Sequence, residues 1–306
     1  MTDSTAGLLA LDCGRTTIWW SLTTPTGRVT GSRGGIETDS PVEPQIAEVA
    51  REILDETGGD AQVLACGSSG LDRADPGAAL AALSGTSIDE VHLAHHSTTS
   101  YLGALGDGEG VMITSNTGVV ALAVAGSQVA RVDGWGWVMG EAGSAYWIGR
   151  NALEAAMRGY DGRRQSTLLT DLIATRFDDL ELAYLELQGA PDRVARVASY
   201  ATLVDEAAHN DPVARNILDK AAAHLAEAVV AAAHRVCLGR GEPPTVCALG
   251  RTFESARVLD RFVAFLRLDW PAFELTEPQA DEVVGAERLV TLHDGPLAAR
   301  VARARR

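Results

Sequence analysis

A strand-rich pattern occurs twice in this chain, and each copy is followed by helical sequence. The first copy, residues 7–34, holds the apolar run LLALDC, the β-rich run TIWWSLTT and, after a turn at Pro25, the run GRVTGSR. The second copy, residues 110–133, holds GVMITS, GVVALAV and SQVARVDG with tight turns between them. Two such halves predict an α/β protein whose sheets are flanked by helices. Ligands of such proteins bind at the carboxyl ends of strands and in the cleft between domains.

The rest of the chain alternates helix and strand signals. VHLA (91–94) predicts a strand that enters the polar segment HHSTTS, and a helix follows toward Leu105. The turn GDGEG (106–110) is the best candidate for a domain boundary. We therefore expect a first domain over 1–106 and a second over 107–291, with a C-terminal helix at about 292–306 that packs back on the first. Other expected strands lie in AQVLACGSSG and PTVCALG, and other expected helices cover 43–57, 76–84, 143–158, 165–175, 180–187, 192–208, 211–237, 254–267, 282–290 and 295–304.

The composition of the chain argues against several classes of binding partner. The net charge of −15 argues against a surface for nucleic acid or anionic membrane. The longest apolar stretch, 225–238, is interrupted by charged residues and is shorter than the ~20 residues of a membrane span. The first residues lack a signal-peptide pattern, so we expect a cytoplasmic protein. Lys220 is the only lysine, which leaves no Walker lysine. The four cysteines lack the spacing of metal ligands, and we expect each of them to be a small residue of the hydrophobic core.

Two turns carry residue types suited to phosphate chemistry. In LDCGRTT (11–17), Asp12 closes an apolar strand and is followed by a glycine turn and threonines. A carboxylate there could orient Mg²⁺-bound water, while turn N–H groups and hydroxyls face phosphate oxygens. The second turn, TSNTGVVALAV (114–124), could cradle another phosphate. Taken alone, the first segment fits an ordinary hairpin, with Asp12 capping the turn, better than a phosphate site, and the second fits a simple turn equally well.

Two further segments are rich in glycine. GWGWVMGEAGSAYWIGRNAL (134–153) holds three of the six tryptophans, and Glu141 offers an acceptor for sugar hydroxyls. We expect Gly143 and Ser144 to begin a helix whose free N–H groups face a ligand. TVCALGRTFES (245–255) reads as strand, glycine turn and helix, which suits either a nucleotide pocket or a simple connection.

These four segments, in this order, resemble the BadF/BadG/BcrA/BcrD ATPase family and, within it, the N-acetylglucosamine kinases of the actin-like ATPase superfamily. The resemblance covers about residues 7–290. Its most specific part is 134–153, which is similar to the family signature GGWG…LGDEGSGYWIG. GSSGLDR (67–73) resembles the sugar-side loop of the family. The resemblance implies two RNase H-like domains with an interdomain cleft.

The resemblance also implies roles for individual residues, with ATP and a small-molecule sugar as substrates and Mg²⁺ as the metal. Asp12 would orient Mg²⁺ through water, and His96 stands where the family has its catalytic aspartate. Homodimers are common among similar proteins. The residues implied on the nucleotide and phosphate side are Gly14, Arg15, Thr16, Asn116, Thr117, Gly118 and Gly250. Those implied on the sugar side are Ser69, Asp72, Trp135, Gly136 and Glu141.

Several positions depart from the family pattern. Cys13 and Arg15 replace glycines of the first loop, and Arg251 replaces the second glycine near adenosine. His95 and His96 replace the family's Asn-Asp pair. A histidine can accept a proton near pH 7 but lacks the negative charge of a carboxylate. An arginine in the phosphate loop could bind phosphate bidentately or fill the pocket.

Three functions therefore stay open at the level of sequence. The first is a divergent amino-sugar kinase acting on N-acetylglucosamine or glucosamine. The second is a catalytically degraded homologue, a pseudokinase, that binds a sugar or regulates another protein. The third is an ATPase acting on another partner. Family members of that third kind need clustered cysteines for an iron–sulfur centre, and the cysteines here are scattered.

Overall fold

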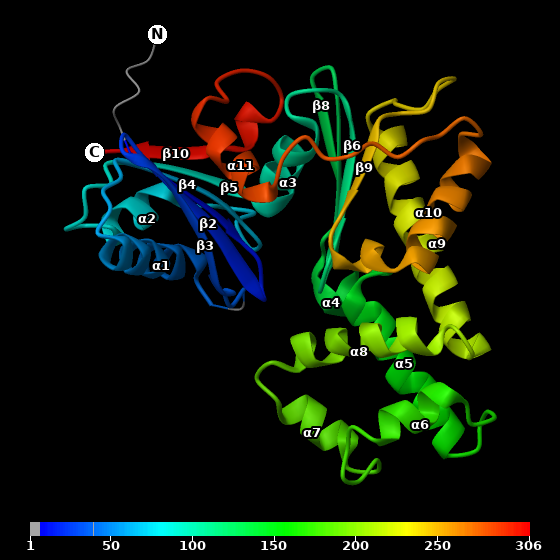
Figure 1. Cartoon of the computed structure of the whole chain (residues 1–306). Helices are drawn as coiled ribbons and strands as arrows, with labels where there is room; N and C mark the ends of the chain where they lie inside the picture. Colours follow the sequence, from blue (N-terminus) through cyan, green and yellow to red (C-terminus); the bar gives the residue numbers. More distant parts are fainter. Residues whose placement is uncertain (1–6, 39) are drawn as a thin grey trace. The chain divides into compact units, whose positions relative to one another are not determined.

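The computed structural model describes residues 7–38 and 40–306, which form two compact units (Figure 1). The first unit contains the described residues up to Glu109 together with Val124–Val129 and Glu277–Arg306. The second contains Gly110–Ala123 and Ala130–Thr276. Each unit holds its own sheet and its own helices, so the predicted α/β class is confirmed.

The first unit is built on a six-stranded sheet in the order β10-β5-β4-β1-β2-β3. β1 pairs in antiparallel fashion with β2 and in parallel with β4, and β4 pairs in parallel with β5. The carboxyl ends of β1, β4 and β5 therefore lie at one edge of the sheet. The strands are β1 (Leu8–Cys13), β2 (Thr17–Thr24), β3 (Gly27–Gly34), β4 (Val63–Ser68), β5 (Glu90–His95) and β10 (Ala302–Arg305).

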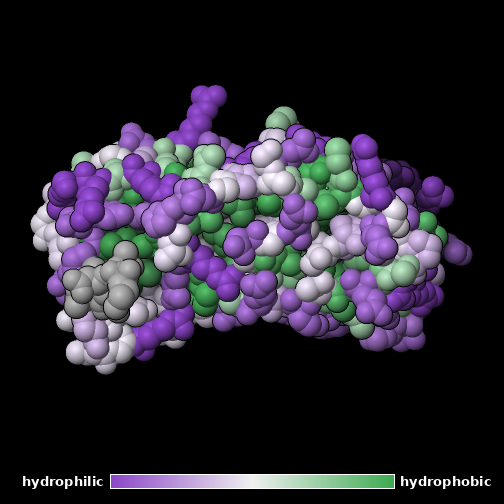
Figure 2. Space-filling view, turned by 90° about the horizontal axis from the view of Figure 1, so that it is seen from above, coloured by the Kyte–Doolittle hydropathy of each residue, from purple (hydrophilic) through white to green (hydrophobic). Residues whose placement is uncertain are grey.

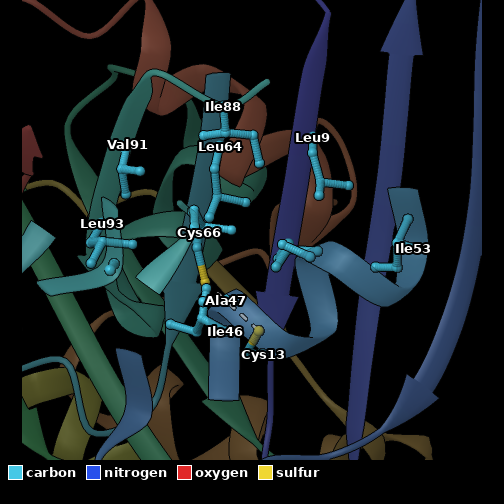
Figure 3. Packing of buried hydrophobic residues seen from close by; sticks show 14 of the residues in the cluster. Leu9, Cys13, Ile46, Ala47, Ile53, Leu64, Cys66, Ile88, Val91 and Leu93 are labelled. Carbon is cyan, nitrogen blue, oxygen red and sulfur yellow. Dashed lines mark hydrogen bonds between the residues drawn. The ribbon is translucent and has the colours of Figure 1, made fainter. Parts of the chain in front are cut away.

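The helix α1 (Val42–Thr57) covers this sheet because its apolar residues recur on one face. Ile46, Ala47, Ala50 and Ile53 are fully buried and belong to one hydrophobic cluster with strand residues. In Figure 3, Ile46 and Ala47 lie beside Cys66 of β4 and Cys13 of β1. In the same core the thiols of Cys13 and Cys66 lie 3.7 Å apart. The helices of the first unit are α1 (Val42–Thr57), α2 (Pro76–Ala82), α3 (His96–Leu105) and α11 (Glu282–Glu287), with short 3₁₀ turns at Arg288–Val290 and Ala298–Arg300.

The second unit has a four-stranded sheet in the order β8-β7-β6-β9, flanked by helices. Its longest helix, α9, begins at Asp211, whose carboxylate accepts hydrogen bonds from the N–H groups of Val213 and Ala214. The strands are β6 (Gly110–Ser115), β7 (Val119–Ala125), β8 (Gln128–Asp133) and β9 (Val246–Leu249). The helices are α4 (Gly136–Met139), α5 (Ala145–Tyr160), α6 (Leu168–Ala174), α7 (Ala183–Gly189), α8 (Arg193–Ala207), α9 (Pro212–Arg235) and α10 (Ala256–Asp269), with a 3₁₀ turn at Arg251–Glu254.

The C-terminal segment differs from the expectation. The helix predicted over 295–304 is wrong, because Ala302–Arg305 forms strand β10 and pairs with the edge strand β5. Arginine and alanine alternate in this segment, and the arginine side chains are the exposed ones. The backbone of the segment forms hydrogen bonds with β5, whose edge would otherwise be open. The contacts place Glu277–Arg306 as a whole in the first unit, whereas we expected the second domain to extend to residue 291. The reason is that α11 packs against α3 and β1.

On the face shown in Figure 2, hydrophilic residues are spread among smaller hydrophobic areas. Within residues 7–38 and 40–306, no helix is long and apolar enough to span a membrane.

One cysteine differs from the expectation of buried core residues, because Cys237 is exposed while the other three are buried.

Candidate active site

Asp12 lies at the end of β1 and is almost fully buried, with 3% of its surface exposed. The turn that follows is tight, because the N–H of Gly14 donates to the carbonyl of Thr17 at 3.0 Å. The amide of Gly14 is thus used within the turn, while Thr16 is exposed and Arg15 is half-buried. Side chains of the turn remain available to a ligand at this edge of the sheet.

His96 comes next to Asp12 through the topology of the sheet. It is the first residue of α3, which begins directly after β5, and β5 and β1 are both parallel to β4. The imidazole Nδ1 of His96 lies 3.5 Å from Oδ1 of Asp12. The hydroxyl oxygen of Thr99, one turn along α3, lies 3.4 Å from the same carboxylate oxygen and 2.9 Å from the carbonyl oxygen of His96. The two residues singled out from the sequence as catalytic therefore form one cluster.

The charge of this cluster is set by its carboxylates. Burial by itself lowers the pKa of His96, because it disfavours the cation. The hydrogen bond to Asp12 and the negative charges of Asp12 and Glu282 outweigh burial and raise the pKa of His96 to about 9. A histidine with this pKa carries its proton at pH 7. It can accept a proton from a substrate only after it has lost its own.

Glu282 is a member of the cluster that the sequence did not indicate. It is the first residue of α11, and its carboxylate accepts a hydrogen bond from the hydroxyl of Ser100 at 3.3 Å. The Ser100 oxygen also lies 3.3 Å from Nδ1 of His96. Burial and the negative charge of Asp12 raise the pKa of Glu282. No local pattern could have identified this residue, since it contacts the cluster only through tertiary packing.

The loop that the resemblance assigns to the sugar follows β4 in the first unit. The N–H of Ser69 donates to the carbonyl of Cys13 at 3.3 Å, so this loop begins beside the end of β1. Asp72, three residues on, is exposed. Both residues thus follow a strand whose carboxyl end lies at the same sheet edge as Asp12.

The second phosphate-type turn lies in the second unit, between β6 and β7. The N–H of Asn116 donates to the carbonyl of Gly118 at 2.8 Å and closes the turn. The Asn116 side chain accepts a hydrogen bond from the N–H of Arg251 at 2.8 Å, which ties the turn to the segment after β9. Gly250 is required there, because its φ is +99° and a Cβ would lie 2.4 Å from the carbonyl oxygen of Ser115. The structure thus brings together three of the residues that the resemblance assigns to nucleotide.

The start of α5 differs from the expectation of free N–H groups facing a ligand. The N–H of Ala145 donates to the carbonyl of Asn116 at 2.9 Å, and that of Tyr146 donates to the carbonyl of Thr117 at 3.2 Å. The N–H of Trp147 donates to the hydroxyl of Ser144. The amides of Ala145 and Tyr146 therefore hold the second turn in place, and that of Trp147 caps the helix, so all three already have acceptors within the chain.

The glycine-rich segment before α5 contains both buried and exposed candidates. Glu141 is 6% exposed, and its backbone N–H donates to the carboxylate of Asp133 at 2.7 Å. Trp135 is 52% exposed, and the guanidinium of Arg131 lies 4.7 Å from the centre of its ring. Gly136 begins α4 directly after Trp135. The exposed indole is a surface on which an apolar sugar face could rest.

Mg²⁺ is compatible with the oxygen atoms around Asp12. The hydroxyls of Thr99 and Ser100 accompany the carboxylates of Asp12 and Glu282, and oxygen is the donor that Mg²⁺ prefers. Among the residues that the structure describes, no three His, Cys, Asp or Glu side chains form a metal-binding group. Mg²⁺ in such enzymes uses one or two carboxylates together with substrate phosphates, so Asp12 would hold the ion through water.

Comparisons with known proteins show the family to which the chain belongs. The family model of the BadF/BadG/BcrA/BcrD ATPases matches residues 11–289. A curated relative, the N-acetylmuramic acid/N-acetylglucosamine kinase of Clostridium acetobutylicum, is 23% identical over 269 residues, which are 83% of this chain and 87% of the relative.

Solved structures show the same fold. A protein of Chromobacterium violaceum designated an N-acetylglucosamine kinase matches with a TM-score of 0.73 and 23% identity, over 92% of this chain and 98% of its own. One of Porphyromonas gingivalis with the same designation matches with a TM-score of 0.72 and 15% identity, over 94% and 100%. A ROK family glucokinase of Streptomyces griseus, solved with glucose and AMPPNP, matches with a TM-score of 0.54 and 16% identity, over 92% and 98%.

Proposed function

Because the chain belongs to the BadF/BadG/BcrA/BcrD ATPase family, we propose that it transfers the γ-phosphoryl group of ATP to a hydroxyl of an amino sugar. The sugar is of the N-acetylglucosamine type, the class named for the relative from Clostridium acetobutylicum. The observation that carries the proposal is the buried cluster of Asp12 and His96 at the carboxyl edge of the first sheet, 3.5 Å apart. Phosphoryl transfer depends mainly on positioning and on neutralising charge, and this cluster supplies both.

In this proposal each of the two phosphate-type turns carries residues assigned to the nucleotide. Arg15 binds phosphate oxygens through its guanidinium, which suits a bidentate contact. Mg²⁺ bound with ATP would neutralise charge on the phosphates, and Asp12 would orient its water. The other residues assigned to the nucleotide are Gly14, Thr16, Asn116, Thr117, Gly118 and Gly250.

The positive charge of His96 has a defined role here. It offsets the negative charges of Asp12 and of the phosphoryl group in transfer, which would otherwise repel each other. The imidazole takes the proton of the sugar hydroxyl only once it has released its own, since its pKa is about 9. The residues assigned to the sugar are Ser69, Asp72, Trp135, Gly136 and Glu141.

The test is a coupled ADP-release assay together with calorimetric binding of Mg·ATP and of N-acetylglucosamine, separately and combined. We expect both ligands to bind and ADP to appear only with sugar. Asp12→Asn should abolish turnover, while the control Asp55→Asn, at an exposed position on α1, should not. Sugar binding without binding of ATP would overturn the proposal in favour of the degraded, sugar-binding alternative.

Two further expectations belong to this proposal. We propose that the protein acts in the cytoplasm, because its relatives are kinases of small sugars. We also propose a homodimer, as is common among similar proteins. Light scattering coupled to size exclusion tests the second expectation, and a monomer at micromolar concentration would contradict it.

A further inference from the structure

Glu282 contacts the Asp12–His96 cluster from a different helix. Its carboxylate oxygen Oε1 accepts the hydroxyl proton of Ser100 at 3.3 Å, across 182 residues of sequence. Ser100 is fully buried, and Glu282 is half-buried. A half-buried carboxylate with a buried hydroxyl donor is a defined contact rather than a solvated surface charge.

The hydroxyl of Ser100 has one proton, and that proton determines how the group meets His96. When the proton is donated to Glu282, the Ser100 oxygen faces the imidazole as an acceptor. The oxygen lies 3.3 Å from Nδ1 and 3.5 Å from Nε2 of His96. Asp12 Oδ1 lies 3.5 Å from the same Nδ1, so the oxygens of Asp12 and Ser100 together surround this nitrogen and orient the ring.

The position of Glu282 is fixed by close backbone contact between α11 and α3. A Cβ on Gly285 would lie 1.9 Å from the carbonyl oxygen of Thr99, so only glycine allows this approach. Just before α11, the N–H of Ala280 donates to the carbonyl of Gly103 at 2.9 Å. α3 also carries His96 and Ser100, so the acceptor and the groups that it orients lie on two helices packed against each other (Figure 1).

We infer that Glu282 is a positioning residue of the site, which acts through Ser100 to hold the imidazole of His96 beside Asp12. The consequence for turnover rests on the proposed function. The geometric claim does not, because it concerns only the orientation of the ring. Without the Glu282 acceptor the Ser100 hydroxyl turns freely, and the ring loses one of its two restraints.

Kinetics test the consequence. Glu282→Ala is expected to lower kcat by about 10- to 100-fold, the size typical of losing an orienting partner, with KM for ATP and sugar nearly unchanged. Glu282→Gln keeps an acceptor oxygen, so its loss should be smaller. Ser100→Ala should match Glu282→Ala, and the double variant should be no worse than either, because both remove one contact. Additive losses would overturn the inference.

A matched control comes from the same helix. Glu287, the last residue of α11, accepts hydrogen bonds from Ser21 and Arg28 and is not part of the cluster. Glu287→Ala should lower thermal stability without changing kcat. Should it reduce kcat as much as Glu282→Ala, the effect of Glu282 would be that of a destabilised helix, and the inference would fail.

Nuclear magnetic resonance tests the geometry without reference to turnover. A ring held by both Asp12 and Ser100 should show imidazole N–H protons of His96 that exchange slowly with water, identified by their loss in His96→Gln. We expect these signals to broaden or vanish in Glu282→Ala and in Ser100→Ala, and to persist in Glu287→Ala. Unchanged signals in Glu282→Ala would refute the positioning role. Signals that change as expected in a protein without turnover would instead refute the proposed function.

Discussion

The protein should lose stability as pH rises from about 6.5 to 9, because of the proton on His96. The pKa of His96 is raised to about 9 in the folded state, against an ordinary value of 6.5. Between these values the folded protein holds a proton that the unfolded chain has released, so the free energy of unfolding falls with pH. The contribution is fully present below pH 6.5 and is lost above pH 9. Its size follows from ~1.4 kcal/mol for each pKa unit and amounts to about 3 kcal/mol.

The assay is urea unfolding of the wild type and of His96→Gln at steps from pH 6 to pH 10. The difference in the free energy of unfolding between the two proteins isolates the contribution of His96, because most other titrating groups contribute equally to both. We expect the advantage of the wild type to decline by about 1.4 kcal/mol per pH unit within the interval. A difference that stays constant with pH would refute the account of His96 as a buried cation paired with Asp12. Because the chain has two units, the transition compared must be the one that the His96 substitution shifts.

Three other predictions follow from packing and exposure. Gly285→Ala should destabilise the first unit by about 1–3 kcal/mol, because its Cβ would overlap a carbonyl of α3. Gly189→Ala, where a Cβ meets nothing within 4 Å, should leave the melting temperature nearly unchanged. Gly118→Ala places a Cβ 2.7 Å from the carboxyl carbon of Glu141, so it should weaken ligand binding measured by calorimetry. A thiol reagent should modify one cysteine of the native protein, Cys237, and all four after denaturation; rapid labelling of more than one would contradict the described burial.

Much of the fold was predictable because its signals are local. The two strand-rich segments follow from alternating and apolar runs, and both are strands in the structure. The α1 helix follows from apolar residues at helical spacing. The expected helix over 211–237 begins at Asp211, whose carboxylate caps the first turn through local hydrogen bonds. The C-terminal strand was missed because ARAR alone fits a helix as well as a strand. Only the open edge of β5 makes it a strand.

The candidate site was likewise predictable only in part. Asp12 and His96 could be singled out because each ends or follows a strand and matches a position of the family pattern. Their adjacency depends on the parallel pairing of β1, β4 and β5. No sequence pattern indicated Glu282 or Ser100, because their roles depend on a hydrogen bond between side chains 182 positions apart.

The sequence by itself therefore determined the succession of strands and helices, the acidic character of the chain and the segments able to carry phosphate chemistry. These properties arise from residues a few positions apart, whose spacing fixes which side chains share a face. The tertiary structure decided the protonation of His96, the partner of α11 and the strand at the C-terminus. Each of these depends on contacts between residues tens to hundreds of positions apart, such as the 84 residues that separate Asp12 from His96. Burial and nearby charge act through space, so a pKa cannot be read from neighbours in the chain.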